Sequence, residues 1–363
     1  MRSGLGVLSV LGLCVVLCAA SAPPACTQVR ASTAIDVNVE LVQVPVVIFD
    51  EKGGVATSLK KDDFRLFEDG VEQRILYFER ERVPVSFVVL ADLSSSMTRK
   101  IPFVQEATLS LLDPPEQEKQ WRDEYSIFGI GKRSRELLPF TTDENDLERR
   151  LPLLLSATNE STALFDGIWM GVSTARQEAL NRNRVMIVIT DGGDNHSRYN
   201  LRETKRFLEE ADMPVFAVMA GPSFELPEIL TPQHKQRNPA PLGKPPGPQL
   251  PNLPFGSSGE DYIGPAERRG PRNMKELTEV TGGGVFTAHH EEDLSRIVRT
   301  IGLAVRYRYV LTYKPMHGDG FTSTRPHIAS TPVEHKVLVQ LYPKEKFRKY
   351  SLPYYKRRYQ GIE

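Results

Sequence analysis

The sequence predicts an α/β fold with a mainly parallel sheet, flanked on both sides by short β segments. Strongly apolar runs at 85–91, 185–189 and 214–220 alternate with helical stretches, which is typical of βα units covered on both faces. Before residue 83 and after residue 305, apolar and polar residues alternate instead, as in half-buried strands. The 363 residues are too many for one ordinary core and indicate two or three domains.

The composition is that of a globular protein, and the chain has no net charge. Hydrophobic residues make up 40% of the chain and charged residues 25%. Because the formal net charge is zero, no long-range field attracts nucleic acid or an acidic membrane. We therefore expect no nucleic-acid partner.

Residues 1–25 have the pattern of a signal peptide. Arg2 precedes an apolar run at 5–17, and the small residues at 19–22 follow it. The apolar run is shorter than the roughly 20 residues that cross a bilayer, and no later segment is apolar enough to do so. We expect an exported protein, periplasmic, cell-surface or secreted, with no transmembrane helix in the mature chain.

All three cysteines, Cys14, Cys18 and Cys26, lie at this end of the chain. The mature protein therefore has no disulfide framework, because a bridge needs two surviving cysteines. A lipid anchor at Cys26 would suit the preceding Ala25 but not the two prolines before it. The alternative to lipidation is simple cleavage near this cysteine, which the prolines favour.

The segment 35–82 reads as β structure. Residues 35–41 alternate, and Val42 to Phe49 are nearly all apolar, which predicts a strand buried on both faces. Asp69-Gly70 favours a tight hairpin turn between the apolar runs on either side of it, Phe64 to Phe67 and Ile75 to Phe78.

The segment 306–363 also contains strand patterns, at 307–313 and 335–342. Each β segment alone is too small to be stable. We expect the two segments to pair with each other into a small β domain.

Residues 83–305 form the expected α/β domain. The pattern predicts helices at 100–112, 144–155, 164–180, 201–211, 273–280 and 293–305, and strands at 85–91, 125–130, 137–140, 184–190, 214–220 and 285–287. Residues 221–271 contain about a dozen prolines and no sustained period, so we interpret them as a surface insertion.

Five oxygen-bearing side chains are the candidate metal ligands: Asp92, Ser94, Ser96, Thr162 and Asp191. The first three form an Asp-x-Ser-x-Ser motif at the carboxyl end of one apolar strand, and Asp191 ends another. In an open parallel sheet the loops at the carboxyl ends of the strands meet at one crevice. Two aspartates that arrive there from two strands can share one cation.

The chemistry of these side chains selects the ion. Carboxylate and hydroxyl oxygens are hard ligands that suit Mg²⁺, Mn²⁺ or Ca²⁺. Magnesium usually takes one or two carboxylates and keeps several waters, which leaves room for a partner's oxygen. If the neutral hydroxyls are the direct ligands and the aspartates act through water, the ion would favour an incoming carboxylate.

At these positions the sequence resembles the von Willebrand factor A family. The motif at Asp92, Ser94 and Ser96 is similar to the first loop of that family's metal-ion-dependent adhesion site, Thr162 to the second loop and Asp191 to the third. The resemblance covers about residues 84–305, from which the Pro-rich insertion departs. It implies a Rossmann-like, doubly wound fold, and a partner protein whose acidic side chain completes the metal sphere.

A further resemblance involves the flanking β segments. Residues 58–70 and the strand 307–313 look like the secreted von Willebrand factor A-related family that is abundant in acidobacteria. No specific activity is established for that family as a whole, so this resemblance predicts architecture better than function. The main hypothesis is a metal-dependent adhesion module of the bacterial envelope or exterior, and not an enzyme.

Several alternatives stay open. The aspartates and serines could be strand-end and turn residues, or they could hold a purely structural metal. The flanking β segments could make the contacts of a structural, envelope-assembly protein. A metal-dependent hydrolase would need a general base, for which His196 and Asp194 are candidates, but Gly-x-Ser-x-Gly and His-Glu-x-x-His motifs are absent from the sequence.

Two other clusters have simpler explanations. His289-His290-Glu291-Glu292 looks like a metal cluster, but acidic residues before an amphipathic stretch favour the start of a helix. Basic and aromatic residues interleave from Lys344 to Arg358 and could stack on single-stranded nucleic acid. An exported chain seldom meets nucleic acid, so we interpret them as an ordinary strand or a binding rim.

Overall fold

The computed structural model describes residues 41–50, 54–112, 122–156, 158, 161–221, 265–316, 332–348, 350, 351 and 353–362. The predicted signal peptide 1–25, Cys26, residues 35–40 and most of the Pro-rich insertion lie outside these ranges. Within them, no helix is long and apolar enough to cross a membrane.

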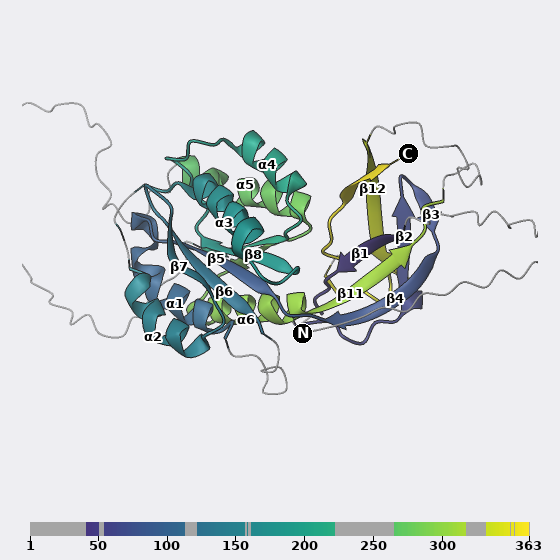
Figure 1. Ribbon diagram of the computed structural model, residues 1–363, viewed down its shortest axis with the longest axis horizontal. Helices are drawn as coiled ribbons and strands as arrows, with labels where there is room; N and C mark the ends of the chain where they lie inside the picture. Colours follow the sequence, from purple (N-terminus) through teal and green to yellow (C-terminus); the bar gives the residue numbers. More distant parts are fainter. Residues whose placement is uncertain are drawn as a thin grey trace, which may run out of the picture. The chain divides into compact units, whose positions relative to one another are not determined.

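A six-stranded sheet forms the centre of the α/β part (Figure 1). Its strand order is β10-β9-β8-β5-β6-β7. The strands are β5 (Ser86–Asp92), β6 (Glu124–Ile130), β7 (Arg135–Thr141), β8 (Arg184–Thr190), β9 (Val215–Ala220) and β10 (Val285–Ala288). All neighbours are parallel except β7, which runs antiparallel at one edge. Every residue of β5, β6 and β9 is buried, as the continuous apolar runs predict for strands covered on both faces.

Helices cover both faces of this sheet, which confirms the predicted doubly wound fold (Figure 1). One core packs α1 (Ile101–Leu109), α2 (Glu144–Leu154) and α6 (Glu291–Arg306) against the sheet. The other core packs α3 (Leu164–Glu178), α4 (Leu201–Glu210) and α5 (Pro265–Thr281) against the opposite face. A 3-10 helix, η2 (Ser95–Lys100), connects the end of β5 to α1.

Helix α5 corrects the prediction for this region. Its expected start was Asn273, after the insertion 221–271, but it begins at Pro265 and continues through Pro271. Proline is well tolerated at the first helical position, where its missing N–H would have no partner. Beside the second proline, Gly270 lies directly against the backbone of Gly192. The sequence pattern alone does not show that contact.

The flanking β segments pair with each other, as predicted. One sheet has the order β1-β11-β4 and the other β13-β12-β2-β3, so each joins strands from both ends of the chain. The strands are β1 (Val42–Val46), β2 (Phe64–Glu68), β3 (Val71–Gln73), β4 (Ile75–Arg82), β11 (Tyr307–Tyr313), β12 (Pro332–Leu341) and β13 (Arg358–Ile362). A short 3-10 helix, η1 (Lys61–Asp63), precedes β2. The two sheets share one hydrophobic core, in which Phe64, Leu66, Leu311 and Tyr313 are fully buried.

Two details of the β segments differ from the prediction. Strand β1 is not buried on both faces: Val44 and Val46 are buried, whereas Gln43 and Pro45 are exposed. Among the described strands it is an edge strand next to β11, where a proline without an N–H can be accommodated.

The hairpin turn at Asp69-Gly70 forms with φ values of 48° and 87°, but its second strand is β3 rather than Ile75 to Phe78. Those residues belong to β4, which pairs with β11 in the other sheet. The chain therefore changes sheets directly after the short strand β3.

A buried ion pair lies where the chain enters and leaves the α/β part. Arg306, at the end of α6, places Nε 2.6 Å from Oδ2 of Asp123, and both side chains are at least 94% buried. The other carboxylate oxygen accepts a hydrogen bond from the backbone N–H of Val85, just before β5. Arg306 also donates to the carbonyl of Leu111 and to the hydroxyl of Tyr125. The pair thus joins α6 to the beginnings of β5 and β6.

Replacing Arg306 tests this junction. The change Arg306→Met leaves the Asp123 carboxylate buried without its cation, so we expect it to lower the free energy of unfolding by about 3–5 kcal/mol. Urea denaturation followed by circular dichroism measures the loss. The matched control is Arg358→Met, which removes an exposed ion pair with Glu334 and should cost at most about 1 kcal/mol. Equal losses in the two variants would contradict the role of the buried pair.

Candidate metal site

Asp92 is the last residue of β5, and its side chain is fully buried at the carboxyl end of the sheet. One carboxylate oxygen accepts a hydrogen bond from the backbone N–H of Ser94 at 3.0 Å. The other accepts from the hydroxyl of Thr190, the last residue of β8, at 2.6 Å. Both oxygens are therefore held in fixed directions by two neighbouring parallel strands.

The two serines of the motif lie beside Asp92. The hydroxyl oxygens of Ser94 and Ser96 are 3.3 Å apart. Ser94 is buried, whereas Ser96 is exposed in the first turn of η2. The first loop thus presents two neutral oxygens side by side, one of them at the surface.

Asp191 follows Thr190 and brings a second carboxylate to Asp92. Burial raises the pKa of Asp92 well above its ordinary range, and the nearby charge of Asp191 raises it further. The described residues around Asp92 compensate its charge with hydrogen bonds and not with a salt bridge. Two carboxylates in this position repel each other, and a cation between them would remove the repulsion.

Thr162 joins the site through the backbone of the third loop. Its carbonyl oxygen accepts hydrogen bonds from the N–H groups of Asn195 and His196, both at 3.0 Å. Its own N–H donates to the side-chain oxygen of Asn195 at 2.9 Å. Thr162 is buried, and it makes these contacts with the loop that begins at Asp191.

The first and second loops are also tied together. The backbone N–H and the hydroxyl of Thr158 both donate to the carbonyl of Leu93, at 2.9 and 3.0 Å. Together with the contacts of Thr162, these bonds connect all three loops that carry the candidate ligands. The structure thus brings Asp92, Ser94, Ser96 and Asp191 together and attaches Thr162 to the same loop cluster.

The third loop supplies the cap of α3. Asp194 Oδ1 accepts hydrogen bonds from the N–H groups of Leu164, at 2.9 Å, and Phe165, at 3.4 Å. Ser197 Oγ also accepts from Phe165, and it accepts from the next N–H group, that of Asp166. Burial raises the pKa of Asp194, although these hydrogen bonds oppose the shift. The beginning of α3 therefore depends on side chains that lie some 30 residues later.

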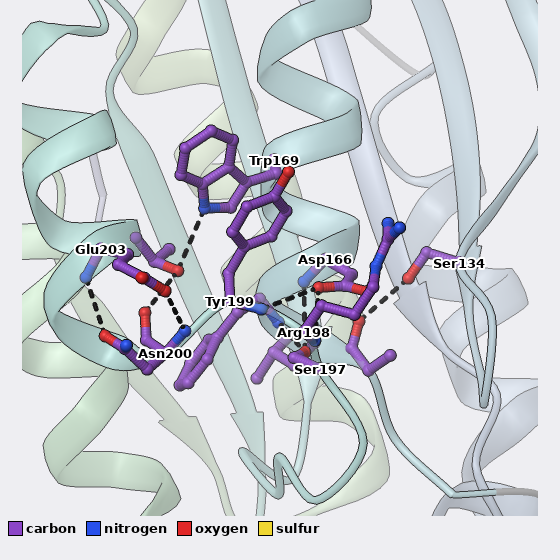
Figure 2. A network of polar contacts seen from close by, with 12 residues as sticks. Ser134, Asp166, Trp169, Ser197, Arg198, Tyr199, Asn200 and Glu203 are labelled. Atoms are coloured by element: carbon purple, nitrogen blue, oxygen red, sulfur yellow. Dashed lines mark hydrogen bonds and ion pairs between the residues drawn. The ribbon is translucent and has the colours of Figure 1, made fainter.

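Figure 2 shows how this loop continues beside α3. The carboxylate of Asp166 accepts from the backbone N–H of Arg198 and forms an ion pair with its guanidinium at 3.0 Å. The ring of Trp169 stacks on Tyr199 with the ring centres 4.0 Å apart. The loop ends at Asn200, which caps α4 together with Glu203. Its course between β8 and α4 is fixed by contacts along its length.

Gly192 lets the same loop pass close to α5. Its φ of +89° is a conformation that other residues rarely adopt. A Cβ atom at Gly192 would lie 2.7 Å from the Cα atom of Gly270, so the position also requires glycine for lack of space. The close packing of the loop after Asp191 against α5 therefore requires glycine at position 192.

The donor set fits a hard divalent cation. All five candidate side chains offer oxygen, and within the described part of the chain no positively charged side chain pairs with the buried carboxylate of Asp92. Sequence reasoning missed Thr190 as the residue that orients Asp92. Asp194 was considered only as a candidate base. The run of polar residues and glycines after an apolar strand, Thr190-Asp191-Gly192-Gly193-Asp194, was the sequence signal that could have indicated both roles.

The simpler explanations of two other clusters agree with the structure. Helix α6 begins at Glu291, and Asp293 accepts from the N–H groups of His289 and His290, so this cluster is a helix start. In the C-terminal cluster, Tyr354 packs edge-on against Phe49 at 5.4 Å. That tyrosine is part of the core and not of an exposed stacking surface.

One group of possible ligands was not foreseen from the sequence. Glu68 and His335, on paired strands of the β segments, and Asp69, in the turn after β2, lie together. Nothing in the sequence pattern joins residues so far apart in the chain.

The cap at Asp194 yields a second test. Asp194→Ala removes the acceptor of the Leu164 N–H and leaves the Phe165 N–H bonded to Ser197 Oγ alone, so we expect a loss of about 1 kcal/mol in the free energy of unfolding. Asp194→Asn keeps the oxygen and should recover most of that loss. Urea denaturation of both variants measures it. Equal destabilisation by alanine and asparagine would show that the hydrogen bonds at α3 are not the cause.

Comparisons with solved structures give weak overall similarity. A von Willebrand factor type A protein from Catenulispora acidiphila has 9% identity over 84% of this chain and 74% of its own, with a TM-score of 0.44. The conserved hypothetical protein BatB from Bacteroides thetaiotaomicron has 17% identity over 61% of this chain and 99% of its own, with a TM-score of 0.39.

A third match is proximal thread matrix protein 1 from the mussel byssus, whose structure has a zinc-occupied MIDAS motif. It has 14% identity over 66% of this chain and 50% of its own, with a TM-score of 0.41. The comparison with curated proteins gave no match.

The family comparison is specific to the region that carries the site. Residues 87–193 match the family described as von Willebrand factor type A domain. The match begins in β5, includes the motif at Asp92 and ends just after Asp191. Together with the doubly wound sheet, it identifies this chain as a protein with a von Willebrand factor type A domain.

Proposed function

We propose that this protein binds a partner protein through a divalent cation, at the envelope or exterior of a bacterium. Asp92, Ser94, Ser96, Thr162 and Asp191 would hold the ion. We expect Mg²⁺, with Mn²⁺ or Ca²⁺ as substitutes, because every donor is a hard oxygen. The bound ion would supply a positive charge that attracts a carboxylate.

The observation that carries the proposal is the pair of acids at the end of the sheet. Asp92 is fully buried, and the charge of Asp191 opposes its ionisation. A buried acid without a positive partner costs free energy, and proteins keep such groups mainly where they have a function. The exposed hydroxyl of Ser96 lies beside this pair, where an ion would remain accessible from outside.

The arrangement also supports a partner with an acidic side chain. Both oxygens of Asp92 already accept hydrogen bonds from the protein, which suits a carboxylate that acts through ordered water. The serine hydroxyls carry no charge. An ion held mostly by neutral ligands keeps part of its positive charge, so a carboxylate would bind it better than a neutral group.

The change Asp92→Asn separates metal binding from folding. The Oδ1 atom of asparagine can still accept from the N–H of Ser94, and its Nδ2 can donate to the Thr190 hydroxyl oxygen, which already accepts from the N–H of Gly192. The contact with Thr190 is thus kept with its direction reversed. It removes the charge that the ion needs and the repulsion with Asp191. We expect Mg²⁺ affinity to fall by at least about ten-fold, while stability in EDTA equals or exceeds that of the wild type. Isothermal titration calorimetry and urea denaturation measure the two quantities.

The control for this variant is Asp212→Asn, whose side chain is 99% exposed. It should change neither Mg²⁺ affinity nor stability. Unchanged Mg²⁺ binding by Asp92→Asn would overturn the assignment of the ion to this site.

Partner binding is tested by affinity capture from the envelope fraction of the source bacterium. The wild type in Mg²⁺ should retain a protein that it loses in EDTA and that Asp92→Asn does not retain. Alanine replacement of one acidic residue in the captured protein should abolish the complex. A complex that survives EDTA and Asp92→Asn would point instead to assembly through the β sheets, and deletion of residues 35–80 would then remove it.

The proposed function is binding and not catalysis. A hydrolase would use His196 or Asp194 as a base, but Asp194 is engaged in capping α3. Metal-dependent turnover of a peptide or phosphoester that stops on His196→Ala would contradict the proposal.

A further inference from the structure

Three side chains with metal-binding atoms meet in the sheet β13-β12-β2-β3. Glu68 is the last residue of β2, and Asp69 follows it in the turn to β3. His335 lies on the neighbouring strand β12. Glu68 and His335 are 5% and 6% exposed, whereas the side chain of Asp69 is half exposed. The group is thus buried on one side and open to solvent on the other.

The spacing of the three atoms suits a tetrahedral ion. His335 Nδ1 lies 2.9 Å from Asp69 Oδ2 and 3.5 Å from Glu68 Oε1. All three ligand atoms lie within 4.8 Å of one another. Ligands at 2.0–2.1 Å from a tetrahedral Zn²⁺ are separated by about 3.3 Å. Only small side-chain movements would therefore bring the three atoms to one ion.

Surrounding groups fix the direction of each ligand. The backbone N–H of Lys336 donates to Asp69 Oδ1 at 2.9 Å, which leaves Oδ2 for the third partner. Tyr359, opposite His335 on β13, donates to Glu68 Oε1 and stacks on the imidazole with ring centres 5.3 Å apart. Outer contacts of this kind orient the ligands of known metal sites.

A separate observation points to a missing ligand. Tyr313 is fully buried, and its hydroxyl lies within reach of Glu68 and of the Tyr359 hydroxyl. Among the described residues it makes no hydrogen bond of good geometry. A buried hydroxyl without a partner costs free energy. A water molecule on a bound metal would satisfy it.

The charges in the group also favour a cation. Two carboxylates face one histidine, so the three side chains have a net negative charge even when the imidazole is protonated. A purely structural hydrogen-bond network would explain the contact of His335 with Asp69. Such a network would still leave the Tyr313 hydroxyl, which lies near both acids, without a hydrogen bond of good geometry among the described residues.

We propose that Glu68, Asp69 and His335 form a second metal site, which takes a Zn²⁺-type cation through one nitrogen and two oxygens and keeps the fourth position for water. Imidazole and carboxylate together suit Zn²⁺, whereas the all-oxygen site at Asp92 suits Mg²⁺. The two sites lie in different cores and differ in metal preference. The second site therefore does not depend on the proposed adhesion function.

Zinc binding is tested in the Asp92→Asn background with Mg²⁺ in excess, so that the loop site does not contribute. The three cysteines near the N-terminus are alkylated beforehand, because thiolates bind Zn²⁺. We expect one equivalent of Zn²⁺ by equilibrium dialysis and a rise in Tm when Zn²⁺ is added. With Co²⁺ as the probe, we expect the visible absorption of a tetrahedral ion.

His335→Gln removes the nitrogen ligand and should weaken Zn²⁺ binding by at least about ten-fold and abolish the Co²⁺ spectrum. The matched control is His289→Gln at an exposed histidine, which should leave both unchanged. If His335→Gln does not fold by circular dichroism, Glu68→Gln and Asp69→Asn provide the same test. No Zn²⁺ bound in the Asp92→Asn background, or equal binding by the folded ligand variants, would overturn the second site.

Discussion

The repulsion between two carboxylates at the carboxyl end of a parallel sheet is the constraint around which this site is built. Parallel strands bring their ends to one edge, so Asp92 after β5 and Asp191 after β8 necessarily approach each other. Inside a protein the repulsion is stronger than in water. The fold tolerates it because hydrogen bonds from Ser94 and Thr190 hold Asp92 in place. A cation bound between the two carboxylates would replace their repulsion with attraction to the ion.

The loops around the two acids are held more firmly than connecting loops need to be. Thr158 joins the second loop to the first, and Thr162 joins it to the third. Asp194 and Ser197 then fasten the third loop to the beginning of α3. Binding sites need such preorganisation, because ligands that move by even 1 Å bind an ion weakly. The hydrogen bonds thus explain how exposed loops could present a fixed set of oxygens.

Much of the fold and of the loop site could be predicted because both are encoded locally. Continuous apolar runs predict buried parallel strands, and polar residues at their ends predict a site at one edge. The start of α5 at Pro265 could not be predicted, because the prolines at 265 and 271 favour a loop in the sequence pattern. The prediction of Ile75 to Phe78 as the second strand of the Asp69-Gly70 hairpin was also wrong, because the chain changes sheets after β3.

The group at His335 was missed for a related reason. It joins positions 266 residues apart in the sequence, and only the pairing of β12 with β2 brings them together. The two flanking segments each have an ordinary strand pattern; one supplies His335 and the other supplies Glu68 and Asp69. Patterns of period two predict strands but not which strands become neighbours.

The most direct test of the loop site is the position of the ion itself. Crystals grown with Mn²⁺ and measured for anomalous scattering would locate it. We expect a peak bounded by the side chains of Asp92, Ser94, Ser96, Thr162 and Asp191, with one coordination position facing solvent. Well-ordered density for these side chains without a peak between them, at saturating Mn²⁺, would contradict it.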